Sequence, residues 1–242
     1  MIEIKELGIR YGSKGVLDGV THTFAKNYTL LGSNGSGKSS LAKALCDLIE
    51  YEGEVLVQGR NIKEYGRKEL AKQIAYVPTR LDIFEADITL FEFVLFGRYA
   101  YKESFVGFDV EDEEIVREKL RFLGLEHLKD HKMGELSSGE TNLALIASAL
   151  VSEAGVIIFD EPTANLDPKN GKKIADVIKN LQQKHQILLI THDIELAHFI
   201  GFDVLFIKER KLFEFSSEEF FHDSTLSSLY GAEFHDLRVF YA

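Results

Sequence analysis

Short runs of apolar residues alternate with longer segments of helical periodicity along most of the chain. Apolar and polar residues alternate through residues 2–9, and an apolar run at 28–32 leads into a glycine-rich turn and a helical pattern over 41–50. Further runs rich in Val, Ile and Leu predict strands at residues 54–59, 74–78, 155–160 and 186–191. Because these runs are apolar throughout, they predict a sheet that is buried on both faces.

The pattern changes between Asp87 and Val151, where helical periodicity replaces the strand pattern. After this segment strand and helix patterns alternate again, and residues 204–215 predict a C-terminal hairpin. We therefore predict a single domain over residues 1–242, in which a helical subdomain at 87–151 interrupts a catalytic core formed by 1–86 and 152–242.

Composition and charge exclude several classes of protein. The chain has 28 basic and 39 acidic side chains, a formal net charge of -11, so we expect no nucleic-acid partner. The single cysteine, Cys46, has no partner for a disulfide or a zinc site and is expected to be a buried, reduced thiol. We expect a cytoplasmic protein, because the N-terminus has no apolar export signal and no apolar run reaches the roughly 18–20 residues that span a bilayer. The acidic run at residues 109–114 is expected to be the solvated start of a helix.

A phosphate-binding loop is predicted between the strand at 28–32 and the helix that follows it. Residues 32–39 read Gly-Ser-Asn-Gly-Ser-Gly-Lys-Ser and match the pattern G-x-x-x-x-G-K-[ST]. Gly35 and Gly37 allow a tight loop whose N–H groups converge on phosphates, and the helix dipole favours negative charge at the same place. Lys38 is expected to reach the β- and γ-phosphates of a nucleotide, and Ser39 to offer its hydroxyl to Mg²⁺.

Two carboxylates follow the apolar strand at 155–160. Asp160 and Glu161 therefore lie at the carboxyl edge of the predicted sheet, where open α/β folds bind their ligands. We expect Asp160 to face Mg²⁺ and Glu161 to orient and deprotonate the attacking water. His192 follows a second apolar strand and is expected at the same edge. His127 and His131 are four residues apart, but no third metal ligand is evident beside them.

Between the loop and the acid pair, residues 136–140 read Leu-Ser-Ser-Gly-Glu. With the loop and the acid pair, this segment resembles the signature LSGGE or LSGGQ of the nucleotide-binding subunits of ABC transporters, and the resemblance covers essentially the whole chain. It implies an α/β fold with a RecA-like P-loop NTPase core, a mainly parallel sheet, N-terminal antiparallel strands and an inserted helical subdomain. It also implies Tyr11 as the aromatic residue that stacks on adenine, residues 164–167 as the D-loop and His192 as the switch histidine.

In that family two subunits pair head to tail, so that the signature of one completes the ATP site of the other. The helix opened by Ser137, Gly139 and Glu140 would then face a γ-phosphate held by the opposite loop. The resemblance thus implies a homodimer, permease subunits in the membrane, indirectly a substrate-binding protein, and a place on the inner face of the cell membrane. The expected catalytic residues are Lys38, Glu161 and His192, and the expected Mg²⁺ ligands are Ser39 and Asp160. The expected ATP contacts are Tyr11, Gly32, Ser33, Asn34, Gly35, Ser36, Gly37, Lys38, Ser39, Ser40, Ser137, Gly139, Glu140 and Asp167.

Two positions depart from the family pattern. Thr79 stands where the family has a glutamine that helps to bind Mg²⁺ and senses the permease, and Ser138 replaces a glycine of the signature. The segment at residues 96–100 is similar to the ATPases of iron–siderophore, haem and vitamin B12 importers, although Ala100 replaces their proline. Two other interpretations remain open, namely an ABC ATPase without a transport role and a regulatory cassette with weak hydrolysis. A P-loop kinase is disfavoured, because a kinase has no use for the segment at 136–140.

Overall fold

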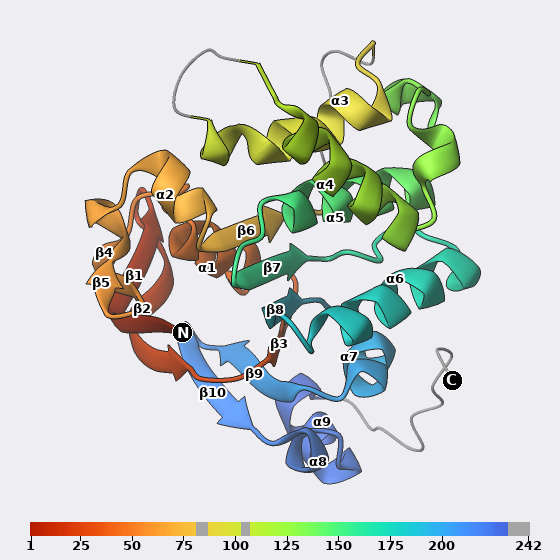
Figure 1. Cartoon of the computed structure of the whole chain (residues 1–242). Helices are drawn as coiled ribbons and strands as arrows, with labels where there is room; N and C mark the ends of the chain where they lie inside the picture. Colours follow the sequence, from red (N-terminus) through yellow and green to blue (C-terminus); the bar gives the residue numbers. More distant parts are fainter. Residues whose placement is uncertain (81–86, 103–106, 232–242) are drawn as a thin grey trace.

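Two sheets and a group of helices make up the computed structural model, which describes residues 1–80, 87–102 and 107–231 (Figure 1). The smaller sheet is antiparallel and has the strand order β2-β1-β4-β5. Its strands are β1 (Ile2–Tyr11), β2 (Lys14–Phe24), β4 (Glu52–Val57) and β5 (Arg60–Asn61). The N-terminal antiparallel strands are therefore confirmed.

The larger sheet has the order β10-β9-β3-β8-β7-β6 and is parallel except for the β9–β10 hairpin. Its strands are β3 (Tyr28–Gly32), β6 (Ile74–Val77), β7 (Val156–Asp160), β8 (Gln186–Ile190), β9 (Asp203–Lys208) and β10 (Lys211–Phe215). The predicted α/β class with a mainly parallel sheet is confirmed, and β3 and β7 are buried along their whole length.

Helices cover both faces of the larger sheet. Those outside the segment between β6 and β7 are α1 (Lys38–Leu45), α2 (Arg67–Ala71), α6 (Pro168–Leu181), α7 (Ile194–Ile200), α8 (Ser217–Phe220) and α9 (Asp223–Tyr230), with a 3₁₀ turn η1 (Ile62–Glu64). Helix α1 ends earlier than the pattern over 41–50 predicts, because Asp47 adopts a left-handed conformation with φ of 55°. Burial raises the pKa of the Cys46 thiol just beyond α1 to about 12, which suits an unreactive thiol, although the residue is only partly buried and not fully buried as expected.

Between β6 and β7 the described chain is helical. It contains α3 (Leu90–Leu95), α4 (Val110–Phe122) and α5 (Ser138–Val151), with the 3₁₀ turns η2 (Phe96–Tyr101), η3 (Glu126–Leu128) and η4 (Met133–Glu135). These elements lie together at one end of the molecule in Figure 1. In the described part of the chain, no helix is long and apolar enough to cross a membrane.

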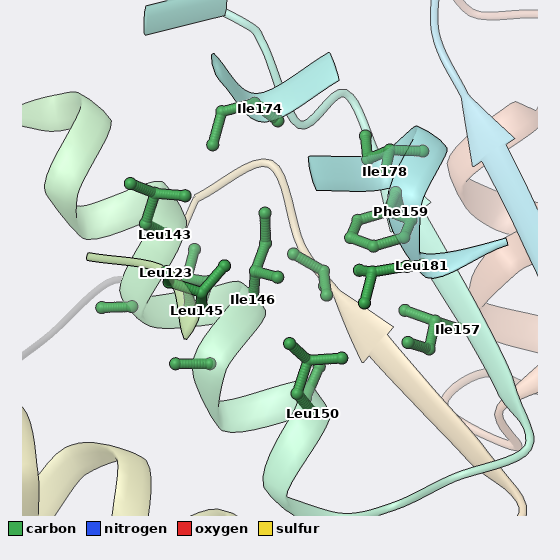
Figure 2. Packing of buried hydrophobic residues seen from close by; sticks show 14 of the residues in the cluster. Leu123, Leu143, Leu145, Ile146, Leu150, Ile157, Phe159, Ile174, Ile178 and Leu181 are labelled. Atoms are coloured by element: carbon green, nitrogen blue, oxygen red, sulfur yellow. The ribbon is translucent and has the colours of Figure 1, made fainter. Parts of the chain in front are cut away.

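Alternate side chains of β7 enter two different cores. Ile157 and Phe159 pack against α5 and α6, as Figure 2 shows, whereas Ile158 packs on the opposite face with α1 and the smaller sheet. Phe159 is completely buried, so we expect its truncation to alanine to cost about 3–5 kcal/mol of folding stability. Packing on both faces fixes the end of β7, and therefore the direction in which Asp160 and Glu161 leave the sheet.

The acidic run at residues 109–114 begins α4 as predicted, with Asp109 as its N-cap, but it is not wholly solvated. Asp112 is only 3% exposed and accepts a hydrogen bond of 3.0 Å from Arg98 Nε. Lys102 also pairs with Asp112, and Arg98 reaches Glu153 at 2.7 Å. The expectation of a solvated run is wrong at Asp112, because Arg98 supplies the charge that lets this carboxylate be buried.

Candidate active site

The loop from residue 32 to 39 joins β3 to α1 at the carboxyl edge of the larger sheet. Gly35 and Gly37 have φ angles of 78° and 109°, which side chains rarely tolerate. A Cβ on Gly37 would also lie 2.4 Å from Val16 Cγ1, so β2 packs directly against the loop. Helix α1 then begins without a side-chain cap and without an acidic residue in its first turn. Its N-terminus therefore offers the combination of open N–H groups and positive dipole that binds phosphate.

Lys38 is 7% exposed and lies against the loop that precedes it. Its ammonium group donates to the carbonyl oxygens of Gly32 at 2.9 Å and of Ser33 at 3.2 Å. Burial lowers the pKa of Lys38, while the nearby carboxylates of Glu161 and Asp160 act in the opposite direction. The cation is thus held at the loop by two carbonyl oxygens, and the two acids at the same sheet edge favour its charged form.

A cavity of about 330 Å³ lies over the loop. Tyr11, at the end of β1, is half exposed on its rim, and its hydroxyl lies 3.3 Å from Ser40 Oγ. The lining also contains Lys14 and Glu161, which come from distant parts of the chain. Of the predicted loop residues, Asn34, Gly35, Gly37, Lys38, Ser39 and Ser40 line this cavity. Ser33 and Ser36 line a neighbouring hollow, and Ser36 Oγ has no hydrogen-bond partner among the described residues.

Asp160 ends β7 and is 2% exposed. Its Oδ1 atom accepts a hydrogen bond of 3.0 Å from Ser39 Oγ, so the two predicted Mg²⁺ ligands lie together. Its Oδ2 atom accepts one of 2.8 Å from the Tyr76 hydroxyl. The Thr79 hydroxyl donates to the main-chain carbonyl oxygen of Asp160 at 2.9 Å. A serine hydroxyl beside a carboxylate is the kind of oxygen donor set that Mg²⁺ accepts.

Glu161 follows Asp160 in a left-handed conformation with φ of 53°. A non-glycine residue in this region stores strain and is frequent at functional sites. Glu161 Oε2 lies 2.8 Å from His192 Nδ1 and also accepts 3.2 Å hydrogen bonds from Thr191 Oγ1 and from the His192 N–H. The structure therefore brings together the acid pair and the histidine that the two strand ends predict.

The segment at residues 136–140 spans the start of helix α5. Ser137 caps α5 and forms a reciprocal capping box with Glu140. A Cβ on Gly139 would lie 2.8 Å from Asn170 Cγ in α6, so any larger residue there would require the Asn170 side chain to move. Asn142 of α5 donates to the Pro162 carbonyl at 3.0 Å, which ties α5 to the turn after Glu161.

Asp167 caps α6 by accepting hydrogen bonds from the N–H groups of Lys169 and Asn170. It also accepts one from the Asn170 side chain, so it shares a neighbour with Gly139. The residues that line the cavity over the P-loop include none of Ser137, Gly139, Glu140 and Asp167. Within the described part of this chain, the predicted ATP contacts thus fall into two groups, one at the loop and one at the starts of α5 and α6.

Sequence reasoning missed three residues of this site. Tyr76 is the polar residue of an otherwise apolar strand, and that interruption is the signal that points to it. Thr191 directly precedes His192, and Lys14 begins β2 just across the turn from Tyr11, the predicted adenine-stacking residue that ends β1. His127 and His131 acquire no such support, since in residues 1–80, 87–102 and 107–231 no three His, Cys, Asp or Glu side chains are grouped to hold a metal ion.

Comparisons with known proteins agree with this geometry. The family model described as "ABC transporter" matches residues 19–164, a range that includes the loop, the segment at 136–140 and the acid pair. A Bacillus subtilis protein named "Probable siderophore transport system ATP-binding protein" is 33% identical over 217 residues, which cover 88% of this chain and 78% of that protein. A Helicobacter pylori protein named "Probable iron chelatin transport ATP-binding protein" is 32% identical over 219 residues, which cover 88% of this chain and 86% of that protein.

A solved structure is similar over most of its length. It is described as the dimeric structure of a bacterial ABC transporter cassette, and it matches with a TM-score of 0.77 at 27% sequence identity. The match covers 90% of this chain and 99% of that one. The arrangement of sheets and helices described above is therefore that of a known nucleotide-binding fold.

Proposed function

Because this chain belongs to the ABC transporter family, we propose that it is the ATP-hydrolysing subunit of a membrane importer that takes up an iron chelate. Family membership makes the chain a nucleotide-binding protein and an ATPase. The proposal concerns the residues that do the chemistry, the partners and the transported compound. Its main support is the carboxyl edge of the larger sheet, where Ser39, Asp160, Glu161 and His192 lie together beside the P-loop.

The P-loop and the start of α1 are proposed to hold the phosphates of ATP, and Tyr11 to stack on its adenine. The open glycine loop, the uncapped helix and the half-exposed ring at the cavity rim all fit this role. Ser39 and Asp160 are proposed to hold Mg²⁺, whose oxygen donors they supply. The ion, when bound, neutralises charge on the β- and γ-phosphates.

Glu161 is proposed as the general base. It projects from the strained turn after β7 and is held at one oxygen by Thr191 and His192, so its second oxygen can orient the attacking water and accept its proton. His192 is 58% exposed at its side chain, beside the glutamate. We propose that it contacts the γ-phosphate when ATP is bound, as the switch histidine of the family would. Lys38 is proposed to offset the charge that develops on that phosphate.

A homodimer is proposed for the hydrolytic state. Ser137, Gly139, Glu140 and Asp167 lie outside the lining of the loop cavity, so a second copy of the chain can use them at its own ATP. The similar solved structure is described as a dimer, which supports the same arrangement. Residues 87–151 are proposed as a helical subdomain that receives permease subunits, with 1–86 and 152–242 as the catalytic core.

The transported compound is proposed from the relatives. The Bacillus and Helicobacter proteins are named for siderophore and iron chelatin transport, and the identities of 33% and 32% extend over most of each chain. We therefore favour an iron–siderophore over haem or vitamin B12. For this role the chain is proposed to bind permease subunits at the inner face of the cell membrane and to act indirectly with a substrate-binding protein.

Two measurements test the proposal. The first is the rate of Mg²⁺-dependent ATP hydrolysis by the purified chain against its concentration, which we expect to rise more steeply than linearly if two copies complete each site. The second is uptake of iron–siderophore, haem and cobalamin by cells in which the native chain is replaced by its Glu161→Gln variant. We expect only iron–siderophore uptake to fall.

The outcomes separate the parts of the proposal. Loss of cobalamin or haem uptake instead of iron–siderophore uptake would contradict the substrate but keep the transport role. Uptake that is unaffected for all three compounds would favour an ABC ATPase without this transport role. A rate strictly proportional to concentration would count against the shared site, and hydrolysis absent without a permease would support a cassette that depends on its partner.

A further inference from the structure

Three hydroxyl groups converge on Asp160 from three different elements. Ser39 Oγ donates to Oδ1 at 3.0 Å, and the Tyr76 hydroxyl donates to Oδ2 at 2.8 Å. Thr79 Oγ1 donates to the main-chain carbonyl of the same residue at 2.9 Å. Both carboxylate oxygens and the carbonyl oxygen of Asp160 are therefore engaged.

Tyr76 reaches Asp160 because of strand register. β6 pairs in parallel with β7, with Tyr76 opposite Ile158 and Val77 opposite Phe159. Asp160 is the next residue of β7, so the long side chain of Tyr76 extends along the strand direction to its carboxylate. Thr79 follows two residues after β6 and secures the backbone at the same place.

We propose that Tyr76 is a positioning residue for the metal-binding carboxylate. A hydrogen bond at Oδ2 fixes the rotation of the Asp160 carboxylate, and the remaining oxygen, Oδ1, is thereby directed toward Ser39. This role rests on the proposed binding of Mg²⁺ by Ser39 and Asp160. Thr79 supports this positioning, because its hydroxyl donates to the main-chain carbonyl of Asp160 and so holds the backbone there.

The chain offers a matched control for a purely structural hydroxyl. The Tyr28 hydroxyl also donates to a carboxylate oxygen at 2.8 Å, on Glu214. Tyr28 begins β3, whereas the P-loop follows the other end of that strand, so its hydrogen bond lies at the opposite edge of the sheet. Tyr76→Phe and Tyr28→Phe each remove one hydroxyl and keep the ring.

The test is calorimetric titration of the purified chain with ADP, once with MgCl₂ and once with EDTA. Wild-type protein is expected to bind ADP more tightly with Mg²⁺, and Tyr76→Phe is expected to lose about tenfold of that preference. Its affinity for ADP in EDTA is expected to be unchanged. In Tyr76→Phe, about tenfold more Mg²⁺ is expected to restore tight binding, because the metal ligand is misdirected and not removed. Tyr28→Phe is expected to keep the wild-type ratio.

Equal Mg²⁺ preference in wild type and Tyr76→Phe would overturn the positioning role and leave the proposed function intact. Loss of the preference in Tyr28→Phe to the same extent would also overturn it, since a general loss of stability would then explain both variants. Weaker ADP binding by Tyr76→Phe in EDTA, not recovered by added Mg²⁺, would assign Tyr76 to folding and overturn the positioning role. A wild type that ignores Mg²⁺ would refute the metal role of Asp160 itself.

Discussion

The N-termini of α1 and α5 are both proposed to meet phosphate groups, yet they are built in opposite ways. Helix α1 starts after Gly37, with no side-chain cap and no acidic residue in its first turn. Helix α5 starts after Ser137, whose Oγ accepts from the Glu140 N–H at 3.4 Å. The Glu140 carboxylate in turn accepts from the Ser137 N–H at 2.8 Å and from its hydroxyl at 2.6 Å.

The two helix starts differ in what they offer to an anion. An uncapped helix start presents N–H groups and partial positive charge, whereas the capping box satisfies such groups and adds a carboxylate. These hydrogen bonds from Ser137 also lower the pKa of Glu140, so its charge is favoured in the folded chain. We infer that α1 binds nucleotide in the single chain and that α5 contributes only when ATP on a second copy competes for the Ser137 hydroxyl.

The largest effect is expected at the acid pair on the α1 side. Glu161→Gln removes the proposed base but keeps a side chain of the same shape, so hydrolysis should fall roughly 10²–10⁴-fold. Nucleotide affinity should be retained, and ATP should trap a dimer because it is no longer hydrolysed. Turnover assays and sedimentation with ATP measure the two effects. Unchanged turnover would remove Glu161 from the role of base.

Lys38→Ala should weaken nucleotide binding by roughly 10–100-fold, because a charge-assisted contact to phosphate is lost. Equilibrium titration with a fluorescent ATP analogue measures it on the single chain. Lys43→Ala is the matched control, since Lys43 lies on the same helix but is exposed and away from the loop. A wild-type nucleotide affinity in Lys38→Ala would contradict the proposed contact between Lys38 and the phosphates.

The α1 side of this comparison was largely predictable from sequence. The residues from Gly32 to Ser39 are contiguous, so their spacing alone specifies the loop, and the apolar run of β7 fixes where Asp160 and Glu161 emerge. The strands predicted at residues 54–59, 74–78, 155–160 and 186–191 agree with β4, β6, β7 and β8 to within two residues at each end. Local pattern was enough wherever the functional groups are neighbours in the chain.

Contacts that depend on register or on distant partners were not predictable. Tyr76 reaches Asp160 across 84 residues of sequence, and this follows only from how β6 pairs with β7. The burial of Asp112 on α4 was not predictable either, because its partner Arg98 lies on a different element, η2. Thr79 stands where the family has a glutamine, and its hydrogen bond to a main-chain oxygen has no sequence signature.

Ser137→Ala tests the α5 side. Loss of the N-cap should lower the free energy of unfolding by about 1 kcal/mol. Hydrolysis by the paired chains should fall about tenfold, since a hydrogen bond to a charged group is lost, while nucleotide affinity of the single chain stays unchanged. Ser216→Ala is the control, because Ser216 and Glu219 form the same kind of capping box at α8. An equal loss of hydrolysis in Ser216→Ala would reduce the role of Ser137 to helix capping.

Glu140→Gln is expected to have the smallest effect, because it removes only the charge at the start of α5. The amide oxygen can still accept the capping hydrogen bonds, but the negative charge at the start of α5 is gone, so repulsion of a facing γ-phosphate is reduced. We expect ATP-dependent association, measured by sedimentation in a Glu161→Gln background, to strengthen about two- to fivefold. Glu219→Gln, in the second capping box, should leave association unchanged.

The stability effect of Glu140→Gln is expected to depend on pH. The folded-state pKa of Glu140 is lowered from 4.5, so its ionised form adds stability that is fully present above pH 4.5 and is lost as the pH falls through the lower folded value. The stability difference between wild type and Glu140→Gln should therefore be constant from neutral pH down to about pH 5 and shrink in stronger acid. Urea unfolding across this range measures the difference. A stability difference that already changes between pH 7 and 6 would assign the effect to another group. In the association experiment, weaker association of Glu140→Gln would show that the carboxylate helps α5 to meet its partner.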